Sequence, residues 1–214
     1  MKFIMEYQAN RSGIYAILNL MEKRIYIGKA TKLQVRAYQH RDDLRKNLEP
    51  NLELQRDYNK PNARLIDFSL VEDVAQEDLL YYESLYIYVA RSWENDESEI
   101  SRLYNCSKSK IDLNGLVKNY NKEKSKVESD LEAAKENFNQ ALQIRFGGRG
   151  PSELVKMQPQ ELAEIVKEYE KSEYKKYRTG ELKRDSLLSC PDFNFKLYSL
   201  YDDSDCEKIN LDQK

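Results

Sequence analysis

The chain has 214 residues, a length that suits one domain or a compact domain with an appendage. Its hydrophobic content of 40% allows a core, its charged content of 34% predicts much solvated helix, and its net charge of -2 is not the overall charge expected of a nucleic-acid binder. The three cysteines lack metal-ligand spacing and are expected to be free thiols. The sequence shows no signal-peptide pattern and no apolar run of membrane-spanning length, so we expect a cytoplasmic protein with no membrane partner.

The charges are distributed unevenly along the chain. Residues 23–46 are rich in Lys and Arg, whereas residues 72–99 are rich in Asp and Glu. Such a pair of segments is explained either by internal ion pairing or by a phosphate-binding face that is backed by an acidic one.

Two short apolar runs, residues 13–20 (GIYAILNL) and 24–28 (RIYIG), predict a β-hairpin that turns between them. Because side chains alternate between the faces of a strand, Tyr15 lies on one face of the first strand and Tyr26 on one face of the second. If these faces coincide, both phenols point at one site.

A helix is predicted from residue 31 to residue 47, with Thr31 as its N-cap. Arg36 and His40 are four residues apart and therefore stack on one face of this helix. His40 is the only histidine of the chain.

The rest of the first half predicts a short helix at residues 51–59, a strand at 64–71 and an amphipathic helix at 76–90. Beyond the first turn of the last helix, Glu83 is a lone carboxylate among apolar and aromatic residues. Residues 103–105 close this unit.

The second half predicts a mainly helical region. A narrow apolar seam indicates a long helix over residues 113–142 that is interrupted at Lys124 and followed by glycines at 147–150. Another helix is predicted to end at Tyr177, beginning at either Ser152 or Gln160.

The first half contains the groups that phosphodiester hydrolysis requires. A base must accept a proton from water, cations must neutralise charge on phosphorus, and a hard oxygen ligand must hold a metal ion. A tyrosine with its ordinary pKa of about 10 is a poor base at neutral pH. Beside Arg36, Lys29 and a divalent cation, we expect that pKa to fall.

Each residue also has an ordinary structural explanation. Tyr15 and Tyr26 are typical strand residues, and a single histidine on a helix is commonly structural or exposed. Arg36 has nearby surface partners in Asp42 or Asp43, and Glu83 has possible partners in Arg56 or Arg64.

In combination, these residues resemble the GIY-YIG nuclease family, whose two name-giving motifs are matched by residues 13–15 and 26–28. The resemblance is greatest to phage intron-encoded homing endonucleases and covers about residues 10–106. The further matching positions are Arg36, His40, Glu83 followed by Tyr86-Ile87, Asn105 after Tyr104, and the run LELQRDYNKPN at 52–62.

The resemblance implies an α+β fold: a small three-stranded antiparallel sheet flanked by helices in residues 1–106, followed by the mainly helical region 107–214. It also implies a metal-dependent endonuclease that cuts double-stranded DNA. The resemblance implies that Tyr15 is the general base or its activator and that Tyr26 supports or shares this role, so that either tyrosine could be the base. Arg36 and His40 would contact the scissile phosphate and the attacking water, and Glu83 would bind Mg2+ or Mn2+. The remaining implied roles are positive charge towards DNA (Lys29, Lys32) and structural positions (Gly13, Gly28, Asn105).

Other functions stay open at this point. The same scaffold would serve a nucleic-acid-binding module that does not cleave, and the long helix would serve an interaction protein. Residues 107–214 either select DNA, through Arg149 and the basic stretch 171–184, or pack on the nuclease or form a dimer. The target sequence, the oligomeric state and the setting (phage or mobile element, restriction or repair) are not given by the sequence.

Overall fold

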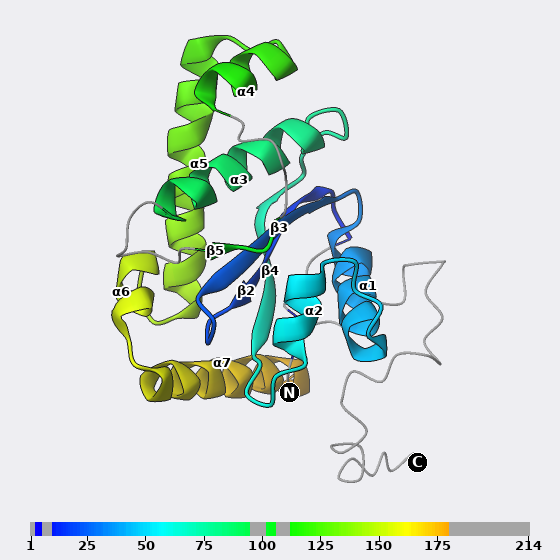
Figure 1. Ribbon diagram of the computed structural model, residues 1–214, viewed down its shortest axis with the longest axis vertical. Coiled ribbons are helices and arrows are strands. Elements are labelled where there is room, and N and C mark those ends of the chain that lie inside the picture. Colours follow the sequence, from blue (N-terminus) through cyan, green and yellow to red (C-terminus); the bar gives the residue numbers. More distant parts are fainter. Residues whose placement is uncertain (1–2, 6–9, 95–101, 106–111, 180–214) are drawn as a thin grey trace.

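A mixed sheet forms the centre of the protein. The computed structural model describes residues 3–5, 10–94, 102–105 and 112–179, and within them five strands lie in the order β1-β4-β2-β3-β5 (Figure 1). The strands are β1 (Phe3–Met5), β2 (Gly13–Asn19), β3 (Arg24–Ala30), β4 (Leu65–Glu72) and β5 (Arg102–Leu103).

The three central strands, β4, β2 and β3, pair antiparallel, as the family resemblance implies. The edge strands β1 and β5 add to them in parallel. The α+β class is confirmed, but the predicted number of strands is wrong. Strands of three and two residues are too short to show an alternating pattern in the sequence.

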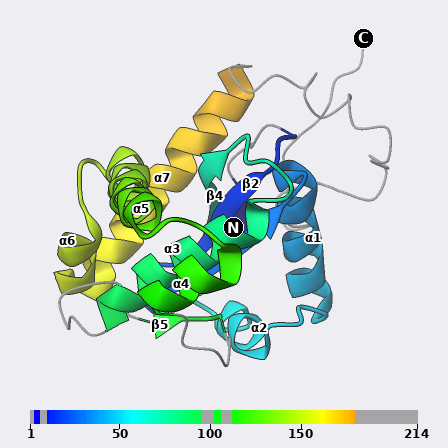
Figure 2. The ribbon, with the colours of Figure 1, turned by 90° about the horizontal axis from the view of Figure 1, so that it is seen from above.

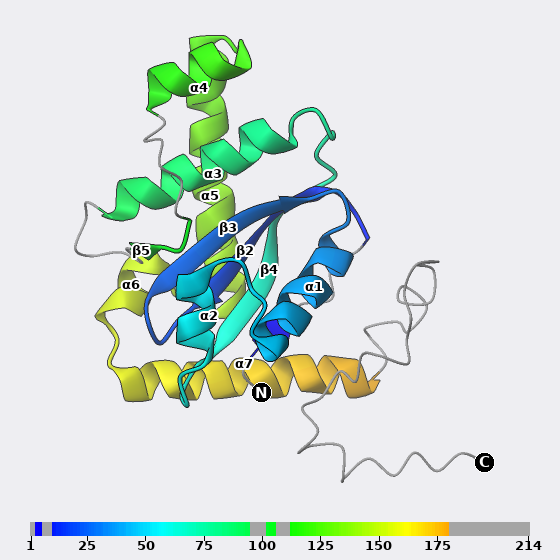
Figure 3. The ribbon, with the colours of Figure 1, turned by 45° about the vertical axis from the view of Figure 1, so that its right-hand side comes forward.

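Two helices cover one face of the sheet, α1 (Leu33–Lys46) and α2 (Leu52–Tyr58), and both stand in front of it in Figure 3. The predicted cap of α1 is wrong, because the N-cap residue is Lys32 rather than Thr31 and makes no side-chain capping bond. The start of α1 is held instead by the Leu33 amide, which donates to the Arg11 carbonyl at 2.9 Å. In α2 the Asn51 side chain caps the helix by accepting from the Leu54 amide.

Two helices, α3 (Leu79–Glu94) and α5 (Lys124–Arg145), cover the opposite face. The remaining helices are α4 (Leu113–Tyr120), which packs on α3 and α5, α6 (Pro151–Lys156) and α7 (Pro159–Thr179). Seen from above, α1 and α5 lie on opposite sides of β2 and β4 (Figure 2), and α7 runs across one end of the sheet. The predicted interruption at Lys124 is where α5 begins. Of the two predicted starts of the last helix, Gln160 agrees with α7, whereas Ser152 lies in the separate short helix α6.

The apolar core is divided by the sheet into two clusters. The smaller one, beneath α1 and α2, contains Tyr15, Ile17, Leu33, Leu44, Leu54 and Tyr104. The larger one extends from Ile14, Ile27 and Phe68 of the sheet to Leu85 of α3, Phe138 of α5 and Val166 of α7. The helices after residue 112 therefore share a core with the sheet.

The helices of the described residues include none that is both long and apolar enough to cross a membrane. Cys106, Cys190 and Cys206 and residues 180–184 of the basic stretch lie outside the described residues.

Candidate active site

A tyrosine, a histidine and an arginine meet where the β2–β3 hairpin packs against α1. The Tyr15 hydroxyl lies 2.7 Å from Nε2 of His40, and Nε of Arg36 donates to the same hydroxyl at 3.3 Å. The Tyr26 ring is 6.1 Å from the Tyr15 ring and 5.5 Å from the His40 ring, centroid to centroid. The structure thus brings together four of the predicted site residues, and the two phenols share one face of the sheet.

Glycines allow this close approach. β2 and β3 pair Tyr15 opposite Gly28, and a Cβ atom on Gly28 would overlap the Tyr15 ring. A Cβ atom on Gly13 would collide with the Val71 carbonyl oxygen of β4 and crowd Leu33 at the start of α1. The two motif glycines therefore set the packing of the tyrosine and of the helix that carries Arg36 and His40.

Burial varies sharply across the site. Tyr15 is 2% exposed and His40 is 0% exposed, whereas Tyr26 and Arg36 are half-buried. Tyr15 and His40 thus form the inner part of the site, and Tyr26 and Arg36 form the part nearer to solvent.

The pKa of the Tyr15 phenol is raised well above 10, mainly by burial and further by the neighbouring phenol of Tyr26. The charge and hydrogen bond of Arg36 lower it, as predicted, but do not outweigh burial. The side chains alone therefore raise the pKa of Tyr15, because a buried phenolate would lose its hydration, and the fall expected beside a divalent cation stays a prediction. Tyr15 is a neutral phenol at physiological pH.

Glu83 of α3 pairs with Lys29 at the end of β3, with 2.5 Å between Oε2 and Nζ. Its charge is among the causes that raise the pKa of Tyr26, after burial, so Glu83 acts on the solvent side of the same site. The structure thus brings Lys29 and Glu83 together, whereas Lys32 is exposed at the N-terminus of α1.

The side chains around Glu83 suit only a metal site in which the protein supplies few of the ligands. Among the described residues, no three His, Cys, Asp or Glu side chains are grouped so that they could hold an ion. Mg2+ commonly takes one or two carboxylates and completes its shell with waters and substrate phosphate oxygens. One partly exposed carboxylate fits that requirement and does not provide a closed cage.

A second buried carboxylate, Glu49, belongs to the site although the sequence pattern does not indicate it. Its Oε2 lies 2.7 Å from Nδ1 of His40, and its side chain is 3% exposed. Burial by itself would raise the pKa of Glu49, but its contacts with His40, the Asn51 amide and the charge of Arg36 hold it below the usual value. Glu49 follows α1 in an irregular segment, where helical spacing gives no signal.

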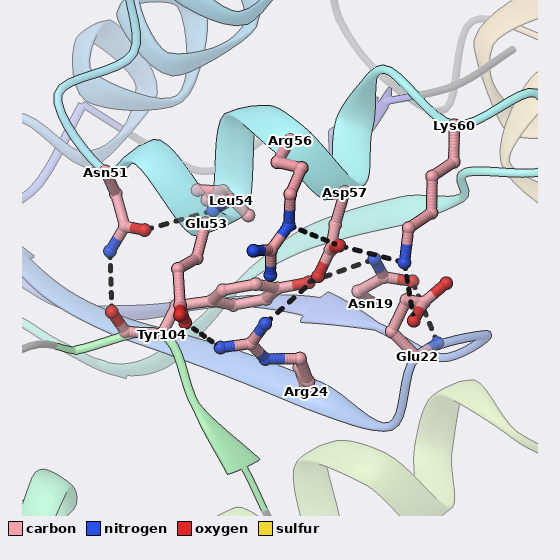
Figure 4. Close-up of polar contacts among 10 residues, drawn as sticks. All are labelled: Asn19, Glu22, Arg24, Asn51, Glu53, Leu54, Arg56, Asp57, Lys60 and Tyr104. Atoms are coloured by element: carbon pink, nitrogen blue, oxygen red, sulfur yellow. Dashed lines mark hydrogen bonds and ion pairs between the residues drawn. The ribbon is translucent and has the colours of Figure 1, made fainter.

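The sequence pattern also gives no role to a buried polar network that joins α2 to the hairpin (Figure 4). The Tyr104 hydroxyl donates to Asp57 at 2.9 Å and accepts from Asn19 at 3.0 Å. Arg24 pairs with Asp57 and with Glu53, and its guanidinium lies 4.2 Å from the centre of the Tyr104 ring. This network fixes α2 and the segment before it relative to the sheet.

Asn105 fastens the end of this unit to β3. Its side-chain oxygen accepts from the Ile27 amide at 2.8 Å, and its side-chain amide donates to the Ile27 carbonyl at 2.7 Å. This pair of hydrogen bonds to the backbone of β3 is consistent with the structural role expected of Asn105.

Comparison with known proteins identifies the family of this part of the chain. The family model described as the GIY-YIG catalytic domain matches residues 11–96. The chain is similar to Intron-associated endonuclease 1 of Enterobacteria phage T4, with 33% identity over 73 residues that make up 34% of this chain and 29% of that protein. No solved structure matches. Residues 11–96 therefore belong to the GIY-YIG catalytic domain family.

Proposed function

We propose that this protein is a metal-dependent endonuclease that hydrolyses phosphodiester bonds of double-stranded DNA. The observation that carries the proposal is the Tyr15 hydroxyl, held between the imidazole of His40 and the guanidinium of Arg36. The family of residues 11–96 and the name of the phage relative support it.

In this proposal Tyr15 is the general base. As its oxygen accepts a proton from the attacking water, its own proton passes to Nε2 of His40, so that Tyr15 stays neutral overall. The new hydroxide forms a bond to phosphorus while one ester P–O bond breaks. His40 is fully buried, so it serves the substrate through Tyr15 rather than by direct contact.

Cations of the site bind the phosphate. Arg36 remains charged, because the two phenols and Glu49 outweigh its own burial and raise its pKa. It stabilises charge that develops on the phosphate oxygens. Lys29 and the exposed Lys32 add positive charge on the side where the DNA backbone would lie.

Glu83 would hold the divalent cation, Mg2+ or Mn2+. When bound, such an ion supplies Lewis-acid neutralisation of a phosphate oxygen or of the leaving oxygen. Lys29 occupies one carboxylate oxygen of Glu83 and keeps that carboxylate compensated before the ion binds.

The helices after residue 112 have a supporting role in this proposal. Since α5 covers the second face of the sheet and the other helices share its core, we place the targeting or dimerising role of residues 107–214 on the outer surface of these helices. The sheet-facing side chains are required for folding.

A supercoiled plasmid tests the activity. Purified protein with Mg2+ should convert it to the nicked or linear form, and EDTA should prevent this. Arg36→Ala and Glu83→Ala should each abolish cutting, whereas the matched controls Arg45→Ala, exposed on the same helix, and Glu132→Ala, exposed on α5, should cut normally.

The rival function, binding without cleavage, makes a different prediction. Wild-type protein would then retard the plasmid in a gel and leave it intact with either Mg2+ or Mn2+, and the endonuclease proposal would be abandoned. Full activity in Glu83→Ala would instead show that the proposed metal ligand is wrong.

A further inference from the structure

We propose that Glu49 is a positioning residue that holds His40 in the one tautomer able to accept the proton of Tyr15. This assignment rests on the proposed function, in which His40 receives that proton. It adds a residue that neither motif contains and that lies nine positions beyond His40 in the sequence.

The hydrogen-bond chemistry determines the tautomer. An ionised carboxylate only accepts hydrogen bonds, so the 2.7 Å contact between Glu49 and Nδ1 of His40 requires a proton on Nδ1. A neutral imidazole then has its lone pair on Nε2, where the Tyr15 hydroxyl lies 2.7 Å away. The direction of all three groups is thereby fixed: Tyr15 donates to His40, and His40 donates to Glu49.

Glu49 is itself held in place from several sides. Its Oε1 accepts from the Asn51 amide at 3.3 Å, and its own amide donates to the Gln55 side chain at 3.2 Å. Asn51 in turn donates to the Tyr104 carbonyl at 2.6 Å, as Figure 4 shows. The carboxylate therefore belongs to the network that joins α2 to the sheet.

The surroundings make this dyad effective. When His40 accepts the phenol proton, the resulting imidazolium is buried, and an isolated buried cation is costly. Glu49 provides the compensating negative charge at 2.7 Å from Nδ1. His40 contacts the side chains of Tyr15 from β2, Tyr26 from β3, and Glu49 from the segment between α1 and α2. Arg36 lies on the other side of the Tyr15 hydroxyl, and the charge of Asp67 on β4 raises the pKa of Tyr15.

Nitrogen NMR reads the tautomer directly. Because the chain has one histidine, every imidazole signal of protein labelled with 15N-histidine comes from His40. In wild-type protein near neutral pH we expect a protonated Nδ1 and an unprotonated Nε2. In Glu49→Gln, whose amide can turn its NH2 group to Nδ1, we expect a large fraction of the opposite tautomer.

Cleavage measurements then separate positioning from a merely structural role. For Glu49→Gln we expect a single-turnover rate reduced by a factor of about 10–100, by analogy with residues that orient catalytic ligands. DNA affinity, measured in EDTA, should stay at the wild-type value. Glu49→Asp, which keeps the charge, should recover part of the rate. The control Asp42→Asn, at a half-buried carboxylate of α1 that pairs with Lys46, should match wild type.

The assignment is overturned if wild-type His40 carries its proton on Nε2, a result that requires no variant to fold. It is also overturned if folded Glu49→Gln cuts at the wild-type rate. A wild-type protein with the expected tautomer that binds DNA but never cuts it would refute the proposed nuclease function, while the orientation of His40 by Glu49 would stand.

Discussion

The ring of Tyr15 lies directly against Gly28, the residue that pairs with it across the β2–β3 hairpin. Any side chain at Gly28 would occupy the space of the phenol. We predict that Gly28→Ala displaces the Tyr15 hydroxyl from His40 and Arg36 and abolishes cleavage. Because overpacking a close-packed site typically costs about 1–3 kcal/mol, thermal unfolding should also occur at lower temperature.

A second glycine provides the control for that change. A Cβ atom on Gly150 would make only an ordinary contact, 4.0 Å from Nε2 of Gln143. Gly150 has a negative φ of -84° and is the N-cap of the short helix α6. Gly150→Ala should alter stability only slightly and should leave cleavage unchanged. Equal activity in Gly28→Ala and wild type would contradict the predicted displacement.

The two tyrosines should differ in their contribution to the rate. Tyr15→Phe removes the hydroxyl that contacts both His40 and Arg36, so its cleavage rate should fall by a factor of about 10²–10⁴, the range of a general base. Tyr26→Phe leaves that contact intact and should lose less. Single-turnover rates on one plasmid substrate measure both variants, and the reverse order would assign the base to Tyr26.

The hairpin, the helix with Arg36 and His40, and the convergence of the two tyrosines could be predicted from the sequence. The alternation of side chains along a strand determines the sheet face on which Tyr15 and Tyr26 lie. A spacing of four residues places Arg36 and His40 on one side of a helix. These are local rules that need only neighbouring residues.

Other parts of the site depend on contacts that no local rule describes. Glu49 reaches His40 from an irregular segment, and Tyr104 reaches Asp57 over 47 positions of the sequence. The pKa of Tyr15 in the absence of a cation could not be predicted from the sequence, because its shift depends on burial, which a list of neighbouring charges does not contain.

The shared core predicts that the nuclease and the helices after residue 112 unfold together. Phe138 of α5 is fully buried, with its ring 6.3 Å from that of Tyr86 on α3. Phe138→Ala should lower the free energy of unfolding by about 3–5 kcal/mol and should shift one cooperative transition. Calorimetry measures this, and Ile144→Ala, at a side chain that is 80% exposed on the same helix, should change little.

A separable unit would behave differently. If Phe138→Ala melted only a low-temperature transition and left the hairpin intact, the helices would form a domain of their own. A chain that ends at residue 106 provides an independent check. It would expose the apolar face that includes Ile14, Ile27 and Phe68, so we expect it to aggregate.

The network of Figure 4 predicts how stability depends on pH. Burial alone would raise the pKa of Asp57, but hydrogen bonds from Lys60 and Tyr104 and the charges of Lys60 and Arg24 hold it below 3.8. A carboxyl whose pKa is lower in the folded state stabilises the fold at pH above its unfolded value. That contribution is lost as the pH falls below about 4 and through the lowered folded-state pKa.

Asp57→Asn should therefore be less stable than wild type at pH 7, by about 1–3 kcal/mol, because Arg24 loses one of its two carboxylate partners and keeps only Glu53. Its stability should decline less steeply than that of wild type below pH 4, because the titrating group is absent. Urea unfolding at pH 7 and at several values below pH 4 measures both effects.

An exposed ion pair provides the control. Asp73→Asn breaks the pair between Asp73, whose side chain is 67% exposed, and Arg11, whose side chain is 54% exposed, and should lower the free energy of unfolding by less than about 1 kcal/mol. Parallel acid profiles for wild type and Asp57→Asn would show that this carboxyl does not contribute to the pH dependence of the fold.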